Sequence, residues 1–101
     1  MKLTELEPQF TRFNGDGRLT DVATLAEAHG VMFICPKCQG HSMLIWFRER
    51  GVPDDATPGP GRWIASGTGY HDLTLSPSIN LDIPGATGGR WHGFVTNGEA
   101  T

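Results

Sequence analysis

Alternating side chains between Leu73 and Ile83 place the strongest constraint on how this chain can fold. In "LTLSPSINLDI" the apolar set is Leu73, Leu75, Ile79, Leu81 and Ile83, and the polar set is Thr74, Ser76, Ser78, Asn80 and Asp82. A period of two predicts a β-strand with one face in the core and the other in solvent. Pro77 falls on the apolar side and has no N–H to donate. The strand is therefore expected at a sheet edge, or bulged at this proline.

Further strands are predicted where short apolar runs lie between turn formers. They are "VMFI" from Val31, "HSMLIWF" from His41, "RWIASG" from Arg62 and "RWHGFV" from Arg90. The one helix candidate is "LTDVATLAEAHG", with Thr20 or Asp21 as its cap and Gly30 at its end. These segments predict a mainly β, small α+β fold, with an antiparallel sheet and one short N-terminal helix.

The chain is expected to form a single domain. Residues 1–18 read as a partly irregular N-terminal segment, and residues 19–101 as one β domain. At 101 residues, with 14 Gly and 7 Pro, a single hydrophobic core is only just adequate. A metal or a cross-link would help such a chain to fold.

Both cysteines of the chain lie in "CPKCQGH", between two of the predicted strands. Cys35 and Cys38 have the spacing of a zinc knuckle, and His41 follows closely enough to join them. His92 is the best candidate for the fourth ligand, with His71 as its competitor. Four protein ligands leave no open position for a substrate, so the zinc is expected to be structural, as in a zinc ribbon. Zinc is favoured over iron.

Two other interpretations of the cysteine pair stay open. One is a redox dithiol, which is disfavoured because the residues after Cys38 read as a strand rather than as a helix N-terminus. The other is a pair of reduced cysteines with no metal.

The net charge of −3 and the isoelectric point of about 5.7 disfavour nucleic-acid binding, which needs clustered Lys and Arg. No apolar run approaches the length of a membrane span, and the N-terminus is not a signal peptide. We therefore expect a cytoplasmic protein that does not associate with membranes.

"GTGYHDLTLSPS" contains residue types that serine hydrolases use. His71, Asp72, Ser76 and Ser78 are nucleophile or base types, but spacing alone cannot establish the geometry of a catalytic triad. A turn followed by a polar strand face is the favoured explanation of these residues. We assign no catalytic residue from the sequence, and His71 and Asp72 are kept as alternative ligands or bases.

Three segments together resemble a known family. "GVMFICPKCQGHSMLIWF", "PGRWIASGTGYHDLTLSPSI" and "WHGFVTNGEAT" are similar to small uncharacterised proteins of bacteriophages and prophages. Some distant relatives of that family carry the label "ammonia monooxygenase". The resemblance implies the same residue types at Cys35, Cys38, His41 and His92. Relatives often have a Cys just before the Trp-His pair, where this chain has "GGR", residues 88–90.

These observations predict a small phage-type accessory protein with a structural zinc, acting in the host cytoplasm through interaction with an unidentified host or phage protein. An enzyme is disfavoured. Two alternatives stay open. One is a metal-dependent hydrolase in which zinc keeps an open site and Asp72 or His71 acts as the base. The other is a nucleic-acid-binding zinc knuckle.

Overall fold

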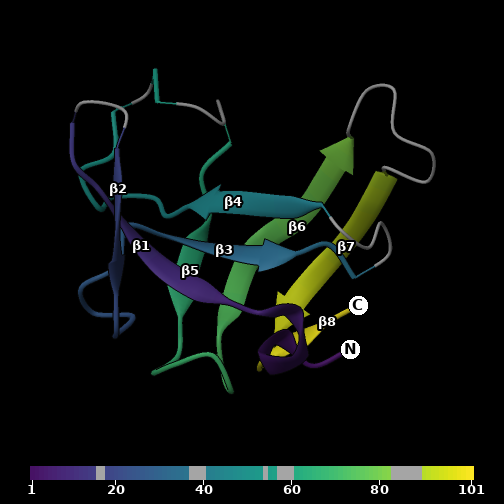
Figure 1. The fold of residues 1–101 in the computed structure, drawn as a ribbon. Coiled ribbons are helices and arrows are strands. Elements are labelled where there is room, and N and C mark those ends of the chain that lie inside the picture. Colours follow the sequence, from purple (N-terminus) through teal and green to yellow (C-terminus); the bar gives the residue numbers. More distant parts are fainter. Residues whose placement is uncertain (16–17, 37–40, 54, 57–60, 83–89) are drawn as a thin grey trace.

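The computed structural model describes residues 1–15, 18–36, 41–53, 55–56, 61–82 and 90–101, which form two antiparallel sheets (Figure 1). The elements are η1 (Leu3–Leu6), β1 (Gln9–Phe13), β2 (Leu19–Val22), β3 (Gly30–Ile34), β4 (Ser42–Trp46), β5 (Ile64–Ser66), β6 (Thr74–Asp82), β7 (Arg90–Thr96) and β8 (Glu99–Ala100). The first sheet has the order β2-β1-β3-β4 and the second has the order β5-β6-β7-β8. The mainly β fold class is confirmed.

The predicted helix after residue 19 was wrong. Leu19–Val22 is strand β2, which pairs with β1, and Gly30 opens β3. Between the two strands the chain makes a turn, in which the Thr24 hydroxyl donates to Glu27 Oε1 at 2.8 Å. So short an amphipathic segment cannot sustain a helix alone, and pairing with β1 outweighs its local preference. In the described residues the one helix is the 3₁₀ turn η1, and no helix there is long and apolar enough to cross a membrane.

The strands predicted from alternation and apolar runs are confirmed as β3, β4, β5, β6 and β7. The irregularity at Pro77 is confirmed as well. Leu75 pairs with Val95 and Ile79 pairs with Gly93, so residues 76–78 of β6 lie opposite Phe94 alone. This bulge keeps Leu75 and Ile79 buried while Pro77 is exposed.

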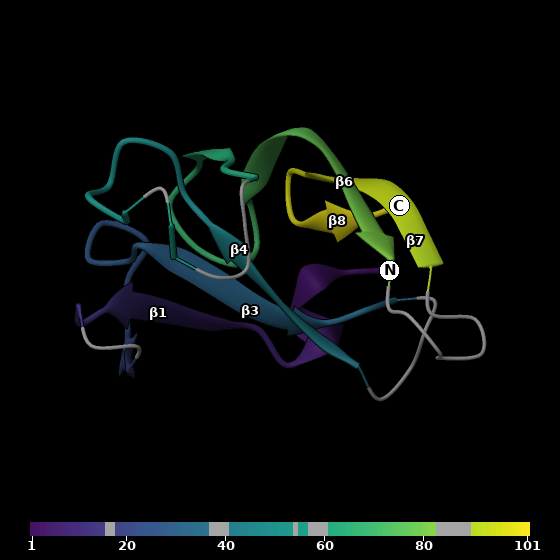
Figure 2. The same cartoon turned by 90° about the horizontal axis from the view of Figure 1, so that it is seen from above.

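The core lies between the two sheets, whose strands run across one another (Figures 1 and 2). Phe33 of β3 and Trp91 of β7 meet edge to face across this core, with ring centroids 6.3 Å apart. Phe10 of β1 stacks on Tyr70, in the turn before β6, at 4.2 Å. Aromatic pairs of this kind join the two layers at both ends.

Two further connections tie the sheets and the chain ends together. Phe47 forms a parallel bridge with Trp63, which links the end of β4 to the start of β5. Lys2 pairs with Glu99 beside β8, and the Ala100 N–H donates to the Met1 carbonyl at 2.8 Å. The N-terminal segment is therefore built into the fold, and the N and C ends lie side by side (Figure 1).

Candidate active site

A serine and a histidine meet on the outer face of the second sheet. Ser78 is the last residue of the β6 bulge and is half-buried, whereas His92 lies on β7 and is exposed. Nε2 of the His92 ring is 3.2 Å from Oγ of Ser78. This distance lies within the range expected for a nucleophile and its general base.

The register of β6 and β7 creates this contact. Asn80 lies directly opposite His92, so Ser78, two residues before Asn80, is the diagonal neighbour of the histidine. Diagonal neighbours on one face of an antiparallel pair lie within reach of long side chains. The indole N–H of Trp63 also donates to the Ser78 carbonyl at 3.2 Å and fixes the backbone at the bulge.

Gly93 allows the strand beside the site to pack tightly. A Cβ at this position would meet the Thr101 carbonyl oxygen, and it would lie 2.7 Å from Cζ2 of Trp91. The neighbouring backbone and the indole thus occupy the space of a side chain. Glycine lets Trp91 fold under β7 into the core while His92 faces outwards.

The pair supplies two of the groups that acyl transfer uses, a hydroxyl and a base. When Nε2 accepts the serine proton, Nδ1 must carry the other ring proton, as in serine hydrolases. In the described part of the chain no hydrogen bond to Nδ1 of His92 is formed. Here the site is a serine–histidine dyad, with the exposed Asn80 beside it.

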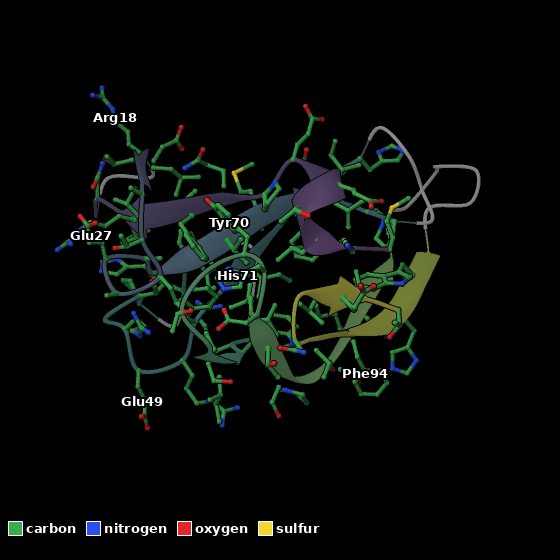
Figure 3. The ribbon with its side chains drawn as sticks, turned by 90° about the horizontal axis from the view of Figure 1, so that it is seen from below. Arg18, Glu27, Glu49, Tyr70, His71 and Phe94 are labelled. Carbon is green, nitrogen blue, oxygen red and sulfur yellow. The ribbon has the colours of Figure 1, made fainter. Side chains whose placement is uncertain are left out.

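His71 and Asp72, the alternative ligands or bases, lie in the turn before β6. Oδ1 of Asp72 accepts from the N–H groups of Thr68 at 2.8 Å and Gly69 at 2.9 Å, and Oδ2 accepts from the Thr68 hydroxyl. The backbone N–H bonds from Thr68 and Gly69, together with that hydroxyl, lower the pKa of Asp72 to about 2. The carboxylate therefore holds the turn together, and Figure 3 shows His71 and Tyr70 near this loop.

Replacement of Asp72 with Asn should reduce the loss of folding stability that the protein shows as the pH falls below about 4. The folded pKa lies below the unfolded value of 3.8, so the carboxylate stabilises the fold above that value, and this contribution disappears as the pH falls towards about 2. Urea midpoints at pH 7, 4 and 2.5 measure the effect. The parent should lose more stability between pH 4 and 2.5 than Asp72→Asn. Parallel profiles would show that the carboxylate does not hold the turn.

The cysteine loop connects β3 to β4. Cys35 is buried in the core, and its N–H donates to the His41 carbonyl at 2.8 Å at the base of the loop. Cys38 lies outside the described residues. Within the described ranges, no group of three or more His, Cys, Asp or Glu side chains is placed to hold a metal. His92 has Ser78 as its neighbour on the outer face. Zinc bound by Cys35, Cys38, His41 and His92 stays a prediction.

A serine hydroxyl within hydrogen-bonding distance of a histidine is one of the features that a serine hydrolase requires. A family model described as "Bacterial ubiquitination-like system serine protease (BubE)" matches residues 6–101. This match spans nearly the whole chain, and the chain belongs to that family. No curated protein and no solved structure matches this chain.

The family corrects the function expected from the sequence. The prediction of a phage zinc-binding accessory protein was wrong, and so were its two alternatives, because the family is described as a serine protease of a ubiquitination-like system. The strand register also places His92 next to Ser78, a contact that the sequence did not predict.

Proposed function

We propose that this chain is a serine protease in which Ser78 is the nucleophile and His92 is the general base. The observation that carries the proposal is the 3.2 Å contact between Oγ of Ser78 and Nε2 of His92 on an exposed sheet face. The family description supplies the reaction class. The bulge and the Trp63 hydrogen bond hold the serine in place before a substrate arrives.

The reaction follows from the positions of the two side chains. As Oγ of Ser78 attacks the scissile carbonyl carbon, Nε2 of His92 takes the hydroxyl proton, and a tetrahedral intermediate forms. His92 then gives this proton to the leaving amine, the C–N bond breaks, and an ester to Ser78 remains. Water then attacks the acyl carbon while His92 accepts a proton from it. The bond between the acyl carbon and Oγ breaks, His92 returns the proton to Oγ, and the carboxylic acid leaves.

The substrate class follows from the family description and the shape of the face. In ubiquitination, the C-terminal carboxyl of the modifier is joined to an amine of its target. A protease of such a system would cleave the bond after the last residue of the modifier. His92 is exposed and Ser78 is half-buried on a sheet face, so an extended protein tail can reach the pair. We therefore take the substrate to be a ubiquitin-like protein joined through its C-terminal carboxyl.

A fusion of the ubiquitin-like protein of the same system to a short C-terminal peptide tests this function. Mass spectrometry of the products should show a cut after the last residue of the modifier. His92→Ala should cleave about 10²- to 10⁴-fold more slowly, because general base catalysis is lost. His71→Ala is the matched control, since His71 is an exposed histidine outside the pair. If His92→Ala kept the parent rate and His71→Ala lost it, the base would lie in the turn before β6, contrary to the proposal.

A further inference from the structure

Two exposed hydrophobic side chains lie on the same sheet face as the serine–histidine pair. The large hydrophobic side chains that are exposed among the described residues are Met1, Leu19, Ile64 and Phe94. Ile64 and Phe94, each 53% exposed, belong to the second sheet. Figure 3 shows Phe94 projecting from β7, away from the first sheet.

Phe94 has a fixed position relative to the reacting groups. It lies two residues beyond His92 on β7, so the two side chains share a face at a spacing of about 7 Å. It is also the residue that faces the bulge at 76–78. The Thr101 N–H donates to the Phe94 carbonyl at 2.9 Å, which holds this part of β7 against the C-terminal residue.

Ile64 lies on the other side of the serine strand. It pairs with Ser76, so its side chain stands across β6 from Phe94 at about 10 Å, the width of two strand spacings. The two apolar side chains thus bracket the β6 bulge that ends at Ser78.

We infer that Phe94, with Ile64 across the bulge, binds a large apolar side chain of the substrate close to the scissile bond. This inference rests on the proposed function and names the specificity of that same site. An extended peptide advances about 3.3 Å per residue. The residue two positions before the one that carries the scissile carbonyl therefore lies about 7 Å from it, which is also the spacing from His92 to Phe94. The contact falls on the acyl side, because the modifier tail is the part that all conjugates share.

Fluorogenic tetrapeptide amides of aminomethylcoumarin test the contact. Two probes differ only at the third residue before the scissile bond, which is Leu in one and Ser in the other. We expect kcat/KM of the parent to be about tenfold or more higher for the Leu probe than for the Ser probe. Tenfold is the lower end of the discrimination that an apolar contact provides. Phe94→Ala should reduce this preference to about threefold or less, and Phe94→Leu should keep most of it.

Leu19→Ala is the matched control, because it removes an exposed apolar side chain from β2 of the other sheet and should keep the parent preference. A parent without preference, or a Phe94→Ala variant that keeps it, would overturn the inference.

The same probes separate this inference from the proposed function. If Ser78→Ala hydrolyses both probes at the parent rate, the proposed function fails, and the inference fails with it. If Ser78→Ala is inactive while Phe94→Ala keeps the parent preference, only the inference about Phe94 fails.

Discussion

Ser78→Ala is expected to lower the rate of tail cleavage by at least about 10³-fold while leaving the fold intact. The loss is large because an acyl-enzyme cannot form without Oγ, and removing the nucleophile of a serine hydrolase removes most of its catalysis. The substitution deletes one half-buried hydroxyl on an outer sheet face, so a small change in stability is expected. Initial rates of fusion cleavage, with circular dichroism of each variant, measure both effects.

Ser76→Ala provides the control for this experiment. Ser76 lies on the same strand, at the other end of the bulge, and is exposed. It should retain the parent rate within about threefold, as expected of a surface substitution away from the reacting groups. If Ser76→Ala were inactive and Ser78→Ala active, the nucleophile would be Ser76, and the proposal for Ser78 would be contradicted.

Phe33→Ala should cause the largest loss of stability. Phe33 is 1% exposed and meets Trp91 edge to face, so its removal leaves a cavity between the two sheets. Truncation of a buried Phe costs about 3–5 kcal/mol. For a domain of this size, that loss corresponds to a decrease in Tm of at least about 12 °C. Thermal melting measures it, and activity should fall with the folded fraction, because Trp91 precedes His92 on β7.

Phe94→Ala makes the same chemical change on the outer face of β7. Since this ring is 53% exposed, its removal should cost less than about 1 kcal/mol. A Phe33→Ala variant that melts with the parent would mean that the two sheets do not pack through Phe33 and Trp91. Equal losses in the two variants would mean that Phe94 is buried in solution.

The strands were readable from the sequence because their signal is local. Alternation along residues 73–83 and the apolar runs around Cys35 mark β6, β3 and β4, and Pro77 marks the bulge. The segment after Leu19 was predicted as a helix because its capping residues and apolar spacing suit one. Its conformation is decided by β1, which lies six or more residues before it and offers a strand edge for β2. Tertiary pairing of this kind does not show in a local pattern.

The candidate site was harder to predict because its two members come from different strands. In the structure Asn80 lies opposite His92, and Ser78 lies diagonally beside the histidine. The sequence does not fix this register, because pairing the predicted strand ends Ile83 and Arg90 would place Leu81 opposite His92. The cysteine motif drew attention instead, since its ligands are close in sequence and need no register.

Mapping the reaction of a fluorophosphonate with the folded protein tests the central claim most directly. This reagent forms a covalent bond to an activated serine oxygen, so peptide mapping by mass spectrometry identifies the nucleophile. We predict one adduct, on Ser78, which forms in the parent and in His71→Ala but is at least about 10²-fold slower in His92→Ala. An adduct on another serine, or an adduct on Ser78 that forms at the parent rate without His92, would contradict the serine–histidine mechanism.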